Sequence, residues 1–151
     1  MLDTFQPLLR AAQGVDLSAP SAARAELARR FDPASAEARA LNEDLKRLLA
    51  EGRVAERGEL PVKYGRVSKA REETLGFSID VVLMSGAGPQ HRHPNGEVNY
   101  CVALDGAPTF DGSPPGWVVF PPDSRHVPTV AGGTMLIVYL LPAGAIEFAV
   151  K

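Results

Sequence analysis

Residues 88–97 read Gly88-Pro-Gln-His91-Arg-His93-Pro-Asn-Gly-Glu97 and carry three side chains of metal-ligand type. On extended backbone, side chains two positions apart point to the same side, so the rings of His91 and His93 can reach one ion. Glu97 opens the next apolar run and can bring a carboxylate to the same place. The stretch therefore predicts extended backbone that carries a metal site.

The third histidine lies downstream in Pro122-Asp-Ser124-Arg-His126, just after an expected turn. The chain has only three histidines, and all of them fit this one pattern. Three His and one Glu suit a divalent transition metal, with positions left open for a ligand, and Fe, Mn, Ni, Co and Zn all remain possible. The single cysteine excludes both an internal disulfide and a Cys-based zinc site.

Short apolar runs separated by Gly and Pro surround this stretch and predict strands. The expected strands are Val62–Val67, Leu75–Met84, Glu97–Leu104, Gly116–Phe120, Thr134–Leu141 and Ala145–Val150. Six strands with no helix between them favour an antiparallel sandwich or barrel over residues 60–151.

The preceding residues, 1–59, are predicted to form a helical arm that packs on the barrel within one structural domain. Residues 1–60 hold three Pro and three Gly, whereas residues 61–151 hold ten and eleven, so helix breakers are concentrated in the β region. Three helices are expected: Leu2–Gln13, a second that follows a Ser18 or Ser21 cap and runs to Phe31, and a third from Asp32-Pro33 to Gly52. The Leu41, Leu45, Leu48 and Leu49 stripe predicts packing on the β region, with a dimer contact as the alternative.

Composition limits the class of function. The chain has 151 residues, 45% of them hydrophobic, and a net charge of −2, which argues against partners such as nucleic acid or a membrane surface. No apolar run approaches the roughly 20 residues that a bilayer-spanning helix needs. We therefore expect a cytoplasmic protein with a small-molecule partner.

Two resemblances sharpen this expectation. His91-x-His93-x3-Glu97 with Gly106, followed by Gly116 and Pro122-x-Ser124-x-His126, resembles the two cupin motifs, although Ser124 stands where glycine is usual. That resemblance implies a mainly β fold: a cupin-like double-stranded β-helix (jelly-roll) barrel with the metal inside, here with an N-terminal helical arm, and often a homodimer.

The chain also resembles the 4-hydroxylaminobenzoate lyase family more narrowly. The matching stretches are Leu75-Gly-Phe-Ser-Ile79, His91-Arg-His-Pro-Asn-Gly-Glu-Val-Asn99, Gly116-Trp117, Ser124-Arg-His126 and Leu141-Pro-Ala-Gly144. The resemblance implies conversion of 4-hydroxylaminobenzoate to 3,4-dihydroxybenzoate with release of ammonia, in nitroaromatic degradation. The alternatives are a cupin dioxygenase or isomerase acting on another small acid, and a non-catalytic small-molecule-binding barrel.

Strand alternation extends the predicted site beyond the metal ligands. If Glu97 points inward, so do Asn99 and Cys101, while Val98 and Tyr100 point outward. Asn99 is a candidate for orienting substrate or water, and Glu97 is either a metal ligand or a proton shuttle. In this hypothesis the metal acts as a Lewis acid on the hydroxylamino oxygen. Cys101 is more easily explained as an inert buried thiol than as a ligand or nucleophile.

An aromatic acid needs a cation for its carboxylate and flat apolar walls for its ring. Arg66 is the preferred cation, with Arg125 as a second candidate and Arg92 and Lys63 as weaker ones. The candidate walls are Phe77, Trp117 and Phe120, which all lie on predicted strands.

Overall fold

The structure is a computed structural model, and it describes residues 1–148 of the chain. Three helices come first, followed by β-strands and one short 3-10 turn at Glu72–Thr74. The helices are α1 (Leu2–Ala12), α2 (Pro20–Arg30) and α3 (Ala36–Ala50). The strands are β1 (Arg57–Glu59), β2 (Val62–Ser68), β3 (Phe77–Met84), β4 (His91–His93), β5 (Glu97–Phe110), β6 (Gly116–Phe120), β7 (Ser124–His126), β8 (Val130–Pro142) and β9 (Glu147–Phe148).

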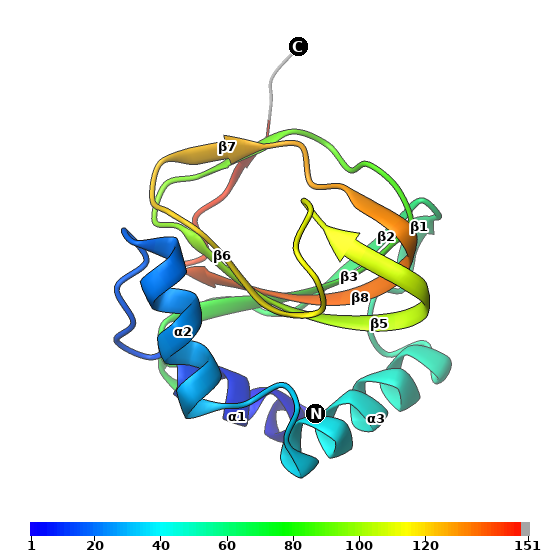
Figure 1. Cartoon of the computed structure of the whole chain (residues 1–151), viewed down its shortest axis with the longest axis horizontal. Helices are drawn as coiled ribbons and strands as arrows, with labels where there is room; N and C mark the ends of the chain where they lie inside the picture. The colour runs from blue at the N-terminus through cyan, green and yellow to red at the C-terminus, as the bar shows by residue number, and fades with distance from the viewer. Residues whose placement is uncertain (149–151) are drawn as a thin grey trace.

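The strands form two antiparallel sheets of unequal size. The large sheet has the order β1-β2-β3-β8-β5-β6, and the small sheet has the order β7-β4-β9. The large sheet lies between the three helices and the small sheet, which closes over its opposite face (Figure 1). This mainly β architecture confirms the predicted cupin-like barrel with an N-terminal helical arm.

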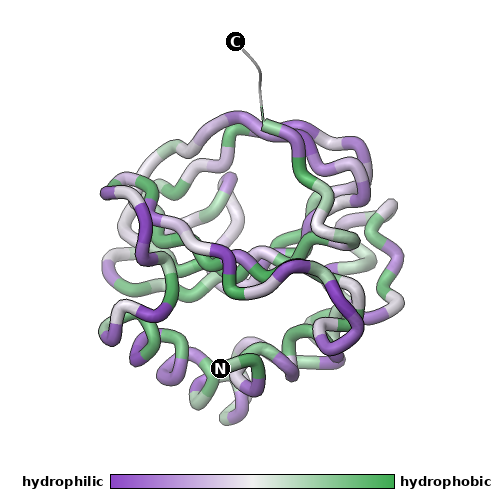
Figure 2. The backbone as a smooth tube through the Cα atoms, turned by 180° about the vertical axis from the view of Figure 1, so that it is seen from behind, coloured by the Kyte–Doolittle hydropathy of each residue, from purple (hydrophilic) through white to green (hydrophobic). Residues whose placement is uncertain are grey.

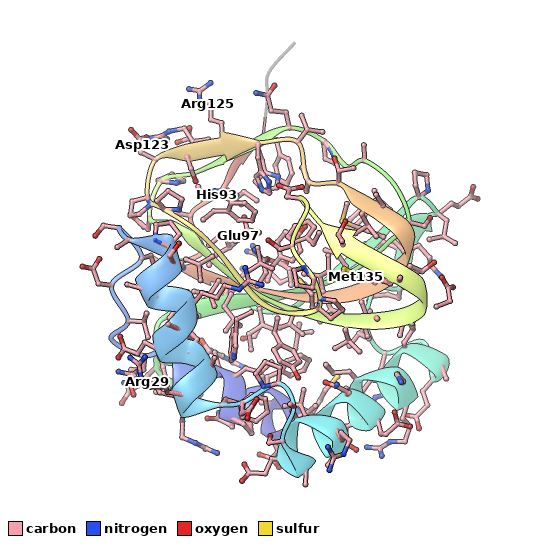
Figure 3. The ribbon with its side chains drawn as sticks, in the orientation of Figure 1. Arg29, His93, Glu97, Asp123, Arg125 and Met135 are labelled. Atoms are coloured by element: carbon pink, nitrogen blue, oxygen red, sulfur yellow. The ribbon has the colours of Figure 1, made fainter. Side chains whose placement is uncertain are left out.

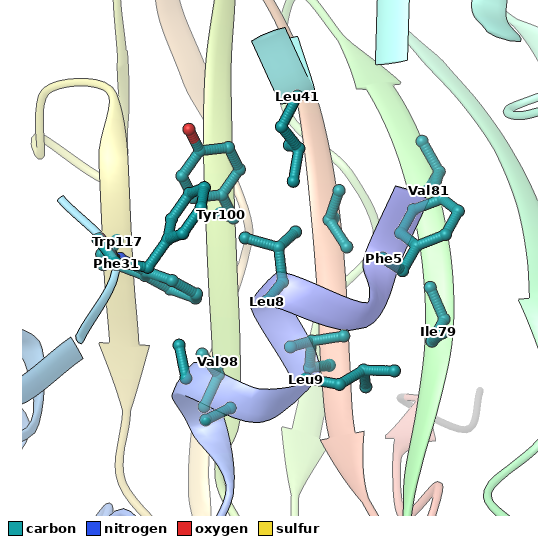
Figure 4. Packing of buried hydrophobic residues seen from close by; sticks show 14 of the residues in the cluster. Phe5, Leu8, Leu9, Phe31, Leu41, Ile79, Val81, Val98, Tyr100 and Trp117 are labelled. Carbon is teal, nitrogen blue, oxygen red and sulfur yellow. Dashed lines mark hydrogen bonds between the residues drawn. The ribbon is translucent and has the colours of Figure 1, made fainter. Parts of the chain in front are cut away.

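The helices cover the outer face of the large sheet and form its main hydrophobic core. Polar and apolar residues recur along the turns of these helices (Figure 2). Such spacing places the apolar residues on one side of an amphipathic helix. Phe5, Leu8 and Leu9 of α1 pack against Ile79 and Val98 on the strands (Figure 4).

Leu41, Leu45 and Leu48 of α3 are buried in this same cluster, and Leu49 packs against it. The prediction that the leucine stripe packs on the β region is therefore confirmed.

The inner face of the large sheet carries a second, smaller cluster that forms the floor of the barrel. Its members alternate along the strands with those of the outer core, because successive side chains of a strand point to opposite faces. On β5, Val98, Tyr100 and Val102 belong to the outer cluster, whereas Cys101 belongs to the inner one. The alternation predicted from Glu97 is confirmed along this strand.

Several element boundaries differ from the predictions for local reasons. Helix α2 has Pro20 in its first turn and neither expected serine as its cap. Helix α3 begins after Ser35, whose hydroxyl accepts a hydrogen bond from the Ala38 amide, so the expected start at Asp32-Pro33 is three residues too early. Its expected end is confirmed, because Gly52 follows the C-cap with a φ of +71°.

Strands β1, β4 and β7 were not among the expected runs, and β1 lies within residues 57–59, which were assigned to the arm. The last expected strand, Ala145–Val150, corresponds to Glu147–Phe148, and its residues 149–150 lie outside the described part. Among the helices of residues 1–148, none is long and apolar enough to cross a bilayer.

Candidate metal centre

Three histidines and one glutamate converge inside the barrel from three strands. His91 and His93 lie on β4, His126 faces His91 across the β4–β7 pair, and Glu97 begins β5. Their ligand atoms all lie within 4.8 Å of one another. Figure 3 shows His93 and Glu97 in the space enclosed by the two sheets.

Glu97 Oε2 lies at the centre of this group. It is 3.2 Å from His91 Nε2 and 3.8 Å from His126 Nε2, and it also contacts His93 Nε2. The Nε2 atoms of His91 and His126 are themselves 3.1 Å apart. One nitrogen of each imidazole thus points at a single carboxylate oxygen.

The other ring nitrogen of each histidine has an acceptor elsewhere in the protein. His91 Nδ1 lies 3.3 Å from the Pro89 carbonyl, and His126 Nδ1 contacts the Asp111 carboxylate. His93 Nδ1 lies 2.9 Å from Ser124 Oγ, whose own hydrogen is donated to the Pro121 carbonyl. These contacts favour an Nδ1–H on every ring, which leaves each Nε2 lone pair directed at the centre.

This donor set fits a bound cation. Three Nε2 lone pairs and an anionic carboxylate in one buried place repel each other unless a positive charge lies between them. Glu97 Oε1 is also buried without a hydrogen-bond partner in residues 1–148. A divalent transition metal satisfies these atoms, and mixed nitrogen and oxygen ligands suit such an ion.

The close packing of these groups also shifts the pKa values of Glu97 and His126 in the metal-free protein. Burial raises the pKa of Glu97, but hydrogen bonds from His126, His91 and His93 outweigh it and bring the pKa well below its usual range. Burial lowers the pKa of His126, but the hydrogen bonds to Asp111 and Glu97 prevail and raise the pKa to about 9. The carboxylate therefore stays ionised and is available as a ligand.

The turn between β4 and β5 brings Glu97 back to the histidines. Gly96 has a φ of +87°, a conformation that side-chain-bearing residues rarely adopt. A Cβ there would also lie 2.9 Å from Leu17 Cδ1 and 3.0 Å from the Phe120 carbonyl oxygen. Glycine at this position therefore lets the chain reverse closely enough for the i and i+4 side chains of His93 and Glu97 to meet.

Aromatic rings surround the histidines. Phe120 stacks on His93 at a centroid distance of 5.6 Å and lies 4.1 Å from the His126 ring. Phe148 lies 5.8 Å from His91, and Phe110 lies 6.1 Å from His126. These three aromatic rings place the ligand atoms in an apolar environment.

A cavity of about 720 Å³ opens beside the cluster and reaches it at His91. Its volume falls within the range of small-molecule sites, and apolar side chains such as Val82 and Leu141 form part of its wall. Arg57 and Arg66 also line it. A flat organic acid can therefore approach the metal centre with a cation near it.

Polar side chains form one row across the inner face of the large sheet. The strand register pairs Arg66 with Asp80, Asp80 with Tyr139, and Tyr139 with Asn99. Arg66 donates two hydrogen bonds to the Asp80 carboxylate, of 2.9 and 3.1 Å. Asn99 is fully buried, and neither of its amide atoms has a partner in residues 1–148. The row leads from the cavity wall to the strand that carries Glu97.

The predicted cations divide into one that lines the cavity and three that do not. Arg66 lines it, as preferred from the sequence. Arg125 is exposed and points outward from β7 (Figure 3), and Arg92 pairs with Asp123 and Glu147 on the same outer side. Lys63 does not line the cavity. A carboxylate-binding role for Arg125 is not compatible with this placement.

Two of the predicted aromatic walls lie on the wrong face of the sheet. Phe77 and Trp117 both belong to the outer cluster that packs under the helices. Trp117 pairs with Tyr100 across β5 and β6, and its indole Nε1 donates a hydrogen bond to the Phe31 carbonyl at 2.9 Å. These residues hold the helical arm and do not touch the cavity. Phe120 packs on His93 and His126 but does not line the cavity in the described part of the chain.

Cys101 is a buried free thiol on the inner face and does not belong to the ligand group. Burial is the main cause that raises its pKa, so the thiol stays protonated. The interpretation as an inert small hydrophobic residue agrees with this environment.

Four residues of the site were missed. Asp111 and Ser124 hold the rings of His126 and His93, while Arg57 and Tyr139 line the cavity. The departure of Ser124 from the cupin motif was the one available signal, because a hydroxyl replaces glycine beside a ligand. Asp111 lies 15 positions from its histidine, and no local pattern relates the two.

Two solved structures resemble this chain over part of its length. A cupin-like protein from Thermotoga maritima MSB8 is 14% identical with a TM-score of 0.41, over 58% of this chain and 75% of that one. An RmlC-like cupin from Ralstonia eutropha JMP134 is 18% identical with a TM-score of 0.42, over 60% of this chain and 59% of that one.

Two curated relatives are both called 4-hydroxylaminobenzoate lyase. The protein from Nocardioides sp. (strain LMS-CY) is 34% identical over 94 residues, and the one from Pseudomonas putida is 31% identical over 102 residues. Each match covers 57% of this chain and 56% or 58% of the relative, so the chain spans little more than half the length of the relatives it matches. The family profile described as PnbB, 4-hydroxylaminobenzoate lyase, matches residues 7–148. By this match over nearly its whole length, the chain belongs to the 4-hydroxylaminobenzoate lyase family.

Proposed function

We propose that this protein is a metal-dependent lyase that converts 4-hydroxylaminobenzoate to 3,4-dihydroxybenzoate and ammonia. The observation that carries the proposal is the convergence of four ligand atoms where a cavity large enough to admit a benzoate meets His91. Membership in the lyase family and the names of the two relatives support the reaction. Substrate plus water equals the diol plus ammonia, so the reaction needs no external oxidant or reductant.

His91, His93, Glu97 and His126 would hold the metal. The bound ion would supply Lewis-acid polarisation of the hydroxylamino N–O bond. The protein's own part begins with the cavity wall, because apolar side chains such as Val82 and Leu141 exclude bulk water around the ring. Glu97 presents Oε2 to the histidines and keeps Oε1 unpartnered, so Oε1 is placed to accept a proton during the reaction.

We assign the substrate carboxylate to Arg66 and Arg57. Asp80 orients the Arg66 guanidinium through Nε and Nη2, and Nη1 has no partner among residues 1–148. Arg57 lines the same cavity and forms no ion pair within the described residues. The Asp80 carboxylate thereby holds the Arg66 guanidinium in position before an anion binds. This lowers the conformational entropy that the Arg66 side chain loses when it binds the anion.

Asn99 is assigned to the reacting end of the substrate. It lies two residues from Glu97 on the inward side of β5, and its free amide can both donate and accept a hydrogen bond. Burying an amide without partners is unfavourable, and a substrate hydroxyl or a water molecule bound there removes that cost.

The test is turnover by the purified protein after its metal has been measured by elemental analysis. We expect one ammonia and one 3,4-dihydroxybenzoate per substrate consumed, at the same rate with and without oxygen. Metal removal should abolish turnover, and metal return should restore it. No turnover by metal-loaded protein would overturn the proposal, and a requirement for oxygen would instead indicate a dioxygenase.

Arg66→Gln, with Arg125→Gln as its matched control, tests the carboxylate assignment. The first should raise KM by about 10-fold or more, whereas the exposed Arg125 should be replaceable without effect. Equal KM values for the two variants would remove Arg66 from the site. A cytoplasmic location and a homodimer remain part of the proposal, and the dimer is checked by the mass of the native protein in solution.

A further inference from the structure

Tyr139 occupies a central position that the proposed mechanism leaves unused. It points inward from β8, as Met135 and Ile137 do, and it lines the cavity. Its ring centroid lies 6.5 Å from that of His91 and 6.2 Å from that of Phe110. The side chain therefore lies in the cavity wall beside His91.

Within residues 1–148, the hydroxyl of Tyr139 has no strong hydrogen-bond acceptor. Its one hydrogen bond in this part of the chain is to Met84 Sδ at 3.7 Å, and a thioether sulfur accepts hydrogen bonds weakly. Buried tyrosine hydroxyls usually find a strong partner, because an unsatisfied donor is costly to bury. Phenylalanine would fill the same volume without that cost, so the hydroxyl calls for an acceptor that enters the cavity.

The row of polar residues Arg66, Asp80, Tyr139 and Asn99 indicates where that acceptor would lie. Tyr139 lies between Asp80 and Asn99 in the register, and Arg66 lies two strands away from it. Two strand spacings place the Arg66 and Tyr139 backbones roughly 10 Å apart on the cavity-facing side of the sheet, a span comparable with a para-substituted benzoate and the hydrogen bonds at its two ends. A carboxylate held by Arg66 would therefore direct the para substituent toward Tyr139 and His91.

We propose that Tyr139 contacts the substrate and donates a hydrogen bond from its hydroxyl to the substituent para to the carboxylate. This inference rests on the proposed function, because it takes a para-substituted benzoate as the ligand. Tyr139 thus selects benzoates that carry an acceptor at the para position over benzoates that carry hydrogen there.

The experiment measures binding of two unreactive probes, 4-hydroxybenzoate and benzoate, to metal-loaded protein by calorimetry. The wild-type protein should prefer 4-hydroxybenzoate by about 10-fold, which is the loss expected when a buried donor is left unpaired. Tyr139→Phe should bind the two probes with nearly equal affinity. Turnover of 4-hydroxylaminobenzoate by this variant should fall by about 10- to 100-fold in kcat/KM.

Two control variants separate substrate contact from a structural role. Met84→Leu removes the sulfur acceptor but keeps the hydroxyl, so its probe preference should match the wild type. Tyr100→Phe removes a tyrosine hydroxyl from the helix-facing side of the same sheet, where it bonds Asn42, and it should also leave the probe preference unchanged. Melting temperature and metal content should be unchanged in Tyr139→Phe, because the ring and its packing remain.

An unchanged probe preference in Tyr139→Phe, or no preference in the wild type, would overturn the assignment. A loss of preference in Met84→Leu equal to that in Tyr139→Phe would also overturn it, because the hydroxyl would then act through the sulfur. Binding preference does not require turnover. A wild-type protein that prefers 4-hydroxybenzoate through Tyr139 but releases no ammonia would therefore contradict the lyase proposal alone.

Discussion

Asp111→Asn is expected to weaken metal binding although Asp111 is not a metal ligand. Its carboxylate has two partners: Oδ1 accepts a hydrogen bond of 2.8 Å from the Thr129 amide, and Oδ2 contacts His126 Nδ1. Asparagine is the same size and keeps the first bond through its Oδ1. Its NH₂ group then faces His126 Nδ1 and donates where the carboxylate accepted.

This reversal moves the proton of the neutral His126 ring. Nδ1 must now accept, so the proton shifts to Nε2, which is the atom directed at Glu97 and the metal position. Loss of such an orienting partner typically reduces metal affinity by about 10- to 100-fold, or about 1.4–2.7 kcal/mol. We expect a loss in this range for Zn²⁺.

The assay is a titration of metal-stripped protein with Zn²⁺ against a chromophoric chelator. Asp123→Asn is the matched control, because it also neutralises an acidic residue of the region but pairs with the outward-facing Arg92. Its Zn²⁺ affinity should equal that of the wild type. Equal affinity in Asp111→Asn, or an equal loss in both variants, would refute the tautomer argument.

Three further predictions concern the ligands, their protons and the helix-facing core. His91→Ala or His126→Ala should abolish ammonia release while the circular dichroism spectrum stays native; retained activity would exclude that histidine as a ligand. The pKa of His126 is raised to about 9 in the metal-free protein, so its imidazole is protonated at pH 7 and metal must displace that proton. Zn²⁺ affinity should therefore rise by about tenfold per pH unit from pH 7 and level off above pH 9, with about one proton released at pH 7.5 in calorimetry across several buffers; a flat profile would contradict this. Trp117→Phe should lower the free energy of unfolding by about 1–3 kcal/mol, because it removes the bond to the Phe31 carbonyl from the helix-facing core, and it should leave Zn²⁺ affinity unchanged.

Local patterns in the sequence were sufficient to group His91, His93 and Glu97, whereas His126 joins this candidate ligand group through the pairing of β4 with β7. The i and i+2 spacing of His91 and His93 is a property of extended backbone, and Glu97 follows within one turn. The inward position of Asn99 follows from the same alternation. These residues could be placed because they lie close together in the sequence and because alternation within each strand sets the direction of its side chains.

The predicted faces of Trp117 and Phe77 were wrong because the face of each residue depends on how its strand pairs with a neighbour. Trp117 faces the helices because β6 pairs with β5 so that Trp117 lies opposite Tyr100, and no feature of residues 116–120 alone reveals that register. Phe77 likewise takes its side from the pairing of β3 with β8. The aromatic residues were therefore recognised as strand residues but assigned to the wrong face.

Contacts between distant segments could not be predicted for a related reason. Asp111 reaches His126 from the far end of β5, and Arg66 meets Asp80 across a strand pair. The three-residue strands β4 and β7 are too short for alternation to identify them without the histidines. Tertiary pairing determines all of these positions.

The division of the large sheet into a helix-facing side and a cavity-facing side has a consequence for divergence within the family. Neighbouring residues on one strand, such as Tyr100 and Asn99, have separate roles, because Tyr100 packs under the helices and Asn99 is proposed to contact the substrate. Substitutions along the inward row can therefore alter substrate range while the helix-facing pattern keeps the protein folded. Homologues that share the outward residues but differ at Arg66, Asn99 or Tyr139 are the ones in which a change of substrate should be sought.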